Sequence, residues 1–179
     1  MKRTLDKITT VTDRICYGVS FFSMAVCIIL AVVLFADVVL RKATGGTVTV
    51  KGAYEIAQML LSTFVFSSWA YTQSVHGHIE VVLLIQRLPQ KLRFIFYAFT
   101  ALLSVVTVAI GAYAVYFQIF KVKASGESTA NLLIPYWPFY IFEFVAFVLL
   151  AVVLLRDAVK AVCAIFNKEI AEEIQGDWV

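Results

Sequence analysis

Four long apolar runs constrain the fold of this chain more than any other feature of its sequence. They cover approximately residues 15–40, 53–75, 92–120 and 137–155. A helix needs about 20 predominantly apolar residues to cross the hydrocarbon core of a bilayer, and each run is long enough. Because no water is present there to satisfy backbone N–H and C=O groups, each run should be an α-helix. A transmembrane barrel would need short alternating strands, whereas these runs are continuous.

The composition excludes an ordinary soluble domain. Hydrophobic residues make up 61% of the 179 residues and charged residues 15%, with a mean hydropathy of +0.88; soluble domains are about 45–50% apolar. The net charge of +3 is too small to indicate nucleic-acid binding. We therefore predict an all-α integral membrane protein in which residues 1–179 form a single four-helix membrane domain.

The distribution of Lys and Arg predicts the orientation in the membrane. The two terminal tails and the connection between the second and third runs together carry ten of these residues, and the other two connections carry five. Since cytoplasmic segments are enriched in Lys and Arg, the N and C termini should be cytoplasmic. Tyr136, Trp137 and Tyr140 agree with this orientation, because they gather where the fourth run should enter from the outside. The first run is too long for a signal-peptide core and should remain as a membrane anchor.

The stretch HGHIEVVLLIQRLPQ, residues 76–90, contains both histidines of the chain. A zinc site needs three or four ligands, and His76, His78 and Glu80 supply at most three. Haem ligation by two histidines needs imidazoles that face each other across helices, which neighbours on one segment cannot provide. We expect neither a metal nor a cofactor in this chain.

The apolar residues of the same stretch follow helical spacing. They predict a short interfacial helix at about residues 79–87, between the second and third runs, that lies along the inner membrane surface. Its apolar face would consist of Ile79, Val82 and Leu83.

Small and polar residues form one stripe on each of the two middle runs, at helical spacing. The stripe on the second run consists of Gln58, Ser62, Trp69 and Gln73, and that on the third run of Thr100, Ser104, Thr107, Gly111 and Gln118. Such stripes allow close approach between membrane helices and hydrogen bonds across them. Helix packing explains them better than an ion path, because they carry too little charge.

Four ionisable residues should gather at the periplasmic end of the bundle as a structural polar cluster. Asp37 and Arg41 are four residues apart and can pair on one helical face. Glu55 opens the second run, and Glu143 lies about 9 Å along the fourth helix from Trp137. An unpaired carboxylate within a membrane is costly, so a network that includes Arg41 is the preferred interpretation. A proton relay is the alternative, but it would need acids or histidines across the full depth.

The ordered set of segments resembles a known family. DVVLR closes the first run, GAYEIAQMLLSTFVFSSWAYTQ leads into GHIEVVLLIQRLP, and IPYWPFYIFEF precedes the last run. Over about residues 15–156 the chain resembles the small membrane subunit (Q type, DctQ-like) of tripartite ATP-independent periplasmic (TRAP) transporters. The resemblance implies a non-catalytic, multi-pass subunit in a bacterial inner membrane, which braces a large membrane subunit.

According to the resemblance, the large subunit carries the substrate and sodium sites, and a soluble periplasmic protein delivers an organic acid such as a dicarboxylate or a sialic acid. The stripes would then serve either internal packing or contact with the large subunit. Exposed loop charges would either help to dock the binding protein or simply be solvated. The candidate docking residues are Lys42, Lys51, Lys121, Lys123 and Glu127.

Two other functions would need features that the sequence lacks. A self-sufficient small transporter should carry charged residues at mid-membrane. A membrane anchor of a redox complex should carry histidines at facing positions on two helices. Neither pattern occurs in the four runs.

Overall fold

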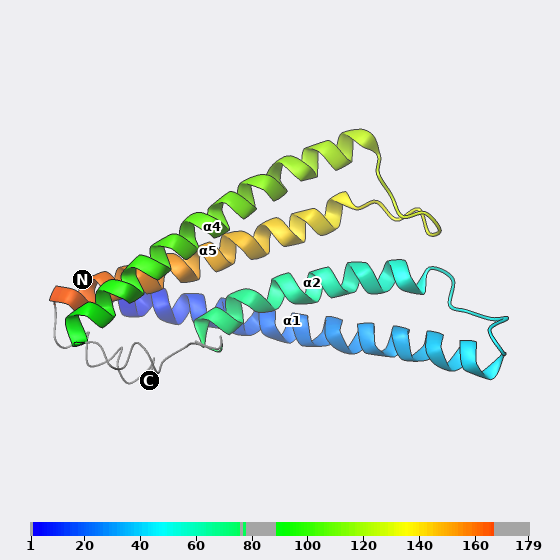
Figure 1. Cartoon of the computed structure of the whole chain (residues 1–179), viewed down its shortest axis with the longest axis horizontal. Coiled ribbons are helices and arrows are strands. Elements are labelled where there is room, and N and C mark those ends of the chain that lie inside the picture. Colours follow the sequence, from blue (N-terminus) through cyan, green and yellow to red (C-terminus); the bar gives the residue numbers. More distant parts are fainter. Residues whose placement is uncertain (1, 76, 78–88, 167–179) are drawn as a thin grey trace.

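The computed structural model describes residues 2–75, 77 and 89–166. Within these residues the chain is all-helical, as predicted, with one isolated β-bridge between Ser128 and Pro135. Figure 1 shows the four helices, which are α1 (Lys2–Ala43), α2 (Ala53–Ser74), α4 (Gln90–Ser125) and α5 (Trp137–Phe166). The predicted interfacial helix at about 79–87 lies outside the described residues.

Two helices extend well beyond the apolar runs that predicted them. Helix α1 begins at Lys2 rather than near residue 15, and α5 continues to Phe166 rather than ending near residue 155. The apolar run is limited by the thickness of the bilayer, but a helix continues until a breaking residue stops it. No Gly or Pro occurs between residue 155 and Phe166, so α5 carries its charged residues on a continuous helix.

Among the described residues, three helices are long and apolar enough to cross a membrane. These segments are Lys7–Ala43 of α1, Leu92–Ser125 of α4 and Trp137–Ile165 of α5. Helix α2 is not among them, because Ser, Thr and Gln residues interrupt its apolar sequence AYEIAQMLLSTFVFSSWAYTQS. Crossing by all four helices and cytoplasmic placement of both termini therefore stay predictions.

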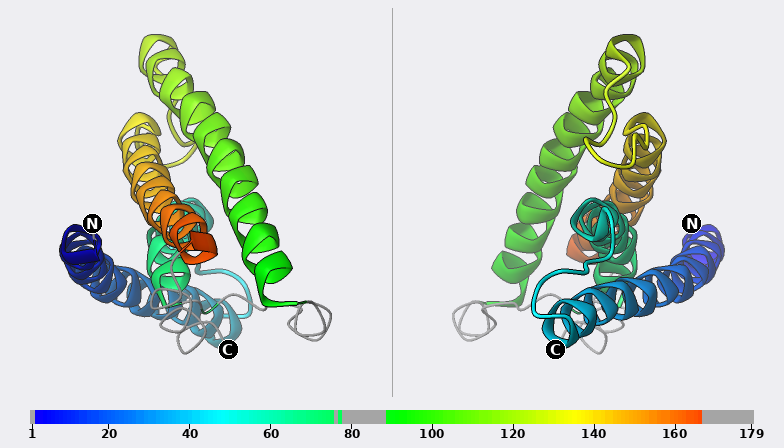
Figure 2. Two further views of the ribbon diagram at one scale, coloured as in Figure 1. Left: turned by 90° about the vertical axis from the view of Figure 1, so that its left-hand side faces the viewer. Right: turned by 90° about the vertical axis from the view of Figure 1, so that its right-hand side faces the viewer.

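The helices pair as two hairpins. Helix α1 packs on α2, α4 packs on α5, and the hairpins contact each other chiefly through α2 and α5. Figure 1 shows that they meet at one end, here named the closed end, where α1 and α4 begin and α2 and α5 end. They diverge toward the opposite end, here named the open end, where α2 and α5 begin. Figure 2 shows α1 and α4 on opposite sides of the α2–α5 pair.

The chain buries little of its own apolar surface. One core cluster joins α1, α2 and α5, and consists of Cys16, Ala70, Leu150, Val153 and Leu154. Only 11% of the most apolar window of α1 and of α4 is buried within the chain, and 22% of that of α5. Most of the apolar surface of these helices is therefore available to lipid or to another subunit.

A close contact holds α4 against α5. A Cβ atom added at Gly111 would lie 2.9 Å from the ring of Phe147. The same ring packs against Phe66 and Trp69 of α2, with centroid distances of 5.3 and 6.0 Å. Phe147 therefore connects the two hairpins, and the absence of a side chain at Gly111 makes room for it.

Replacement of Gly111 by Leu should lower the stability of the bundle by about 1–3 kcal/mol, because the ring of Phe147 must shift. Gly18→Leu on α1 is the matched control, since a Cβ there would meet nothing within 4 Å. Thermal unfolding in detergent should show a lower midpoint for Gly111→Leu alone. Equal midpoints for both variants would contradict the role given to this contact.

Candidate functional site

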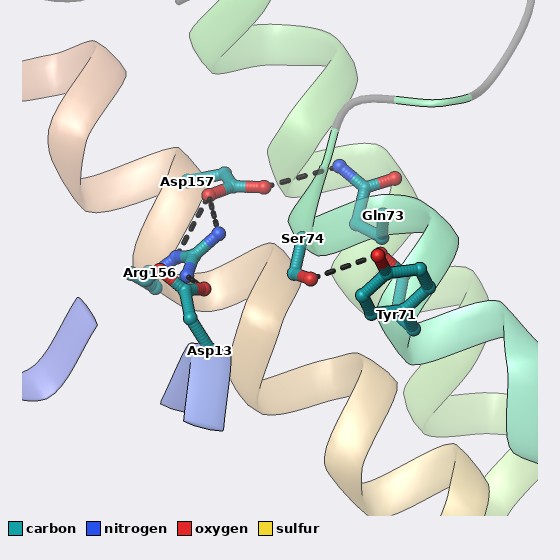
Figure 3. Close-up of polar contacts among 6 residues, drawn as sticks. All are labelled: Asp13, Tyr71, Gln73, Ser74, Arg156 and Asp157. Atoms are coloured by element: carbon teal, nitrogen blue, oxygen red, sulfur yellow. Dashed lines mark hydrogen bonds and ion pairs between the residues drawn. The ribbon is translucent and has the colours of Figure 1, made fainter. Parts of the chain in front are cut away.

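A buried ion-pair cluster joins three helices at the closed end. Arg156 of α5, with a side chain only 3% exposed, pairs with Asp157 of the same helix at 3.0 Å and with Asp13 of α1. Gln73 of α2 donates a hydrogen bond from Nε2 to Oδ2 of Asp157 at 3.0 Å. Figure 3 shows the guanidinium between the two carboxylates, with Gln73 on the other side of Asp157.

The geometry of this cluster compensates most of the buried charge. Arg156 donates from Nε to Asp157 at 3.0 Å and from Nη1 to Asp13. Asp157 is nearly buried, whereas the side chain of Asp13 is 44% exposed and can be solvated. A buried pair of this kind is tolerated when further hydrogen bonds satisfy its atoms, and Gln73 supplies one.

Sequence reasoning missed this cluster. It treated Arg156 only as a positive charge of a cytoplasmic tail, gave no role to Asp13 or Asp157, and placed Gln73 on a packing stripe. A signal was present, because an Arg-Asp pair directly follows the last apolar run and Asp13 lies two positions before the first. Only the packing of α5 beside α1 brings these positions together.

At the open end, the ion pair expected from helical spacing is present. Arg41 Nη2 lies 2.8 Å from Asp37 Oδ2, and Arg41 is 61% exposed. The other oxygen, Oδ1, accepts a hydrogen bond from the backbone N–H of Val50 at 2.9 Å. Asp37 therefore fastens the connection between α1 and α2 to the end of α1.

Glu55, at the start of α2, binds the connection between α4 and α5. Its carboxylate accepts hydrogen bonds from the backbone N–H groups of Asn131 at 2.8 Å and Leu132 at 3.1 Å, and from the side chain of Asn131 at 2.7 Å. Gly52 allows this approach, because an added Cβ would lie 2.4 Å from the side chain of Leu132. Gly52 also has a φ of 72°, which favours glycine.

Glu143 lies apart from these contacts, between α5 and α2. It is half-buried, and the hydroxyl of Ser62 is its hydrogen-bonding neighbour. The four ionisable residues predicted as one cluster thus occupy three sets of contacts: Asp37 with Arg41 and Val50, Glu55 with Asn131 and Leu132, and Glu143 with Ser62.

The polar stripe of α2 lies on the side of α5. Ser62 contacts Glu143, Gln58 lines the same cavity as Glu143, and Gln73 binds Asp157. Trp69 packs edge-on against Phe147. The stripe therefore lies where the second hairpin packs against α2.

The stripe of α4 faces its neighbour only in part. Gly111 contacts Phe147 of α5, whereas Ser104 and Gln118 are half-buried. Thr100 and Thr107 are exposed, and each donates its hydroxyl proton to a carbonyl of its own helix. These two threonines are available to lipid or to another subunit.

The five charged residues proposed to contact the binding protein lie on the surface of the open end. Lys42, Lys51, Lys121, Lys123 and Glu127 are all exposed. The ammonium group of Lys123 lies 5.4 Å from the centre of the Trp137 ring, a cation–π contact.

Long apolar helices that are largely exposed, joined by buried polar contacts, define a helical membrane protein. The family model of tripartite ATP-independent periplasmic transporters, DctQ component, matches residues 30–164, and the chain belongs to this family. It is therefore a small membrane subunit of a TRAP transporter, and so a component of a transport system. No curated protein and no solved structure matches the chain.

Replacement of Arg156 by Met should destabilise the bundle by about 3 kcal/mol, because it leaves Asp157 buried without its cation. Arg41→Met removes an exposed cation from a similar pair and should cost much less. The unfolding midpoints of both variants in detergent, compared with that of the unmodified chain, measure the two losses of stability.

The double variant Arg156→Met with Asp157→Asn tests the cause. It should recover part of the stability, since it also removes the uncompensated carboxylate. A double variant that is no more stable than Arg156→Met would show that lost packing, and not lost charge pairing, explains the effect.

Proposed function

We propose that the chain is the non-catalytic small membrane subunit of a sodium-coupled TRAP secondary transporter for an organic acid of the dicarboxylate or sialic acid type. In this proposal it braces the large transport subunit and helps to dock the periplasmic binding protein. It would lie in the bacterial inner membrane with four crossing helices and both termini in the cytoplasm. Family membership over residues 30–164 carries the proposal.

The exposed apolar surface supports a bracing role. Helices α1 and α4 each bury only 11% of their most apolar window within the chain, so a protein partner can cover much of what is exposed. Large side chains such as Phe35 on α1 and Phe99 and Ile110 on α4 point outward. In lipid these faces are also stable alone, which suits a subunit that is inserted before it assembles.

The placement of charge supports a subunit without its own transport path. Residues 15–36 of α1 and 94–120 of α4 contain no charged residue, and the apolar run of α5 contains only Glu143. A transport path for ions or organic acids needs polar or charged groups across the depth of the membrane. We therefore assign the substrate and sodium sites to the large subunit.

The open end would face the periplasm. The exposed charges Lys42, Lys51, Lys121, Lys123 and Glu127 would steer the encounter with the binding protein there. The connection between α4 and α5, bound by Glu55 through Asn131 and Leu132, would offer it a surface of fixed shape.

Co-expression of the chain with the large subunit tests the proposed function. We expect a stable one-to-one complex that takes up an organic acid only when the binding protein and sodium are present, and no uptake by the chain alone. Proteoliposomes with purified components provide the measurement. Uptake by the chain alone would instead favour a self-sufficient transporter, and co-purification with a haem protein a redox anchor.

The interfacial segment gives a second test of bracing. Val82→Glu or Leu83→Glu should reduce complex assembly and uptake without changing substrate selectivity, because a charge opposes burial of this face in the membrane surface. Glu80→Gln, at a position of the same segment outside this apolar face, is the control and should behave as the unmodified chain. Normal assembly and uptake by both glutamate variants would refute a bracing role for residues 79–87.

A further inference from the structure

Glu143 is the only charged residue within the apolar run of α5, residues 137–155. It lies six residues beyond Trp137, which corresponds to about 9 Å along the helix axis. Tyr and Trp concentrate at the level of the lipid headgroups, so a carboxylate about 1.7 turns deeper lies within the hydrocarbon region. A charge at that depth needs a partner.

The chain itself supplies only a weak partner. The hydroxyl of Ser62 is within hydrogen-bonding reach of Glu143, but Ser62 Oγ also donates to the carbonyl oxygen of Met59 at 3.0 Å. A hydroxyl group has one proton and cannot fully satisfy both acceptors. Among the described residues no Lys or Arg forms an ion pair with Glu143, whereas Asp13, Asp37 and Asp157 each have one.

Two cavities lie beside Glu143, and the smaller one has more polar groups in its lining. One cavity, of about 130 Å³, has polar groups of Gln58, Ser62, Tyr136 and Tyr140 in its lining, together with the apolar Met59 and Phe139. A second cavity, of about 300 Å³, is lined mainly by apolar residues that include Phe22, Phe66 and Phe142. Glu143 lines both cavities. A long side chain with an aliphatic stem and a cationic end matches this arrangement, as Lys and Arg do.

We propose that Glu143 forms an ion pair with a Lys or Arg side chain of the large transport subunit, whose aliphatic stem occupies the apolar cavity between α1, α2 and α5. This inference rests on the proposed function and adds a specific contact to it. The depth of Glu143 favours a protein side chain over a lipid, because a lipid ammonium group stays at headgroup level, outside Trp137. An inorganic divalent cation would need six or more oxygen ligands, whereas the second cavity is lined mainly by apolar side chains.

The test compares Glu143→Gln, Glu143→Asp and Ser62→Ala in the full chain, alone and assembled with the large subunit. Glu143→Gln should weaken association at least about tenfold, because it leaves the partner's cation buried without a counter-charge. The isolated chain should be as stable as before or more stable, since it loses an uncompensated carboxylate. Glu143→Asp keeps the charge and should retain part of the affinity, and Ser62→Ala should have little effect on association.

Three outcomes would overturn the inference while leaving the proposed function intact. The first is association of Glu143→Gln as tight as that of the unmodified chain. The second is a loss of stability in isolated Glu143→Gln that is as large as its loss of association, which would assign Glu143 an internal structural role. The third is that added phosphatidylethanolamine restores the stability of Glu143→Asp but not of Glu143→Gln, while association with the large subunit does not change. This result would indicate that Glu143 binds a lipid headgroup. By contrast, an unmodified chain that does not associate with the large subunit would refute the proposed function itself.

Discussion

The buried guanidinium of Arg156 is the interaction on which the arrangement of the helices depends. Lipid solvates the apolar faces of membrane helices almost as well as other helices do, so apolar contact alone gives little preference for one packing over another. The packing is instead determined by polar groups, which must find partners, and by close contacts between small residues. Arg156 meets Asp13 of α1 and Asp157 of α5, and Asp157 meets Gln73 of α2, so a single cluster fixes three of the four helices at the closed end. The fourth, α4, is held through Gly111 and the ring of Phe147.

At the open end, two carboxylates bind the backbone of connecting segments, and one of them, Asp37, also pairs with Arg41. Asp37 accepts a hydrogen bond from Val50, and Glu55 accepts two from the backbone of Asn131 and Leu132. Each acid sits at a helix end and fixes the connection that follows or faces it. The hairpins are therefore held by the polar cluster at the closed end, where they meet (Figure 1), and by the hydrogen bonds of Glu55 to the α4–α5 connection at the open end, where they diverge. This arrangement agrees with the proposed bracing role, because the divergent end offers surface to a partner.

Hydropathy and helical spacing predicted the features that depend on neighbouring residues. The long apolar runs predicted where the four described helices lie, although α1 and α5 extend beyond their runs. The four-residue spacing of Asp37 and Arg41 predicted their ion pair. The rules failed where contacts join distant segments, since Asp13 and Arg156 are 143 positions apart and only the packing of α5 beside α1 brings them together. Helical periodicity correctly placed the α2 stripe on one face but could not name Asp157 as the partner of Gln73. The same limit explains why Asp37, Glu55 and Glu143 were expected to form one network. Their shared level along the bundle is readable from the sequence, but the direction of each side chain is not.

The distribution of partners among the acids connects the fold to the assembly. Asp13, Asp37, Glu55 and Asp157 all have partners within the chain that account for their charge, as ion pairs or as several N–H donors. Glu143, by contrast, has only the hydroxyl of Ser62, which Ser62 also donates to the carbonyl oxygen of Met59. Burial of a carboxylate without a full partner is costly. A family whose members work in a tripartite transporter provides the context in which such a cost is offset, because a partner's cation can complete the pair. The pairing of buried charge that arranges the helices at the closed end would then also make assembly specific. An unpaired charge in an apolar site favours the one arrangement that compensates it.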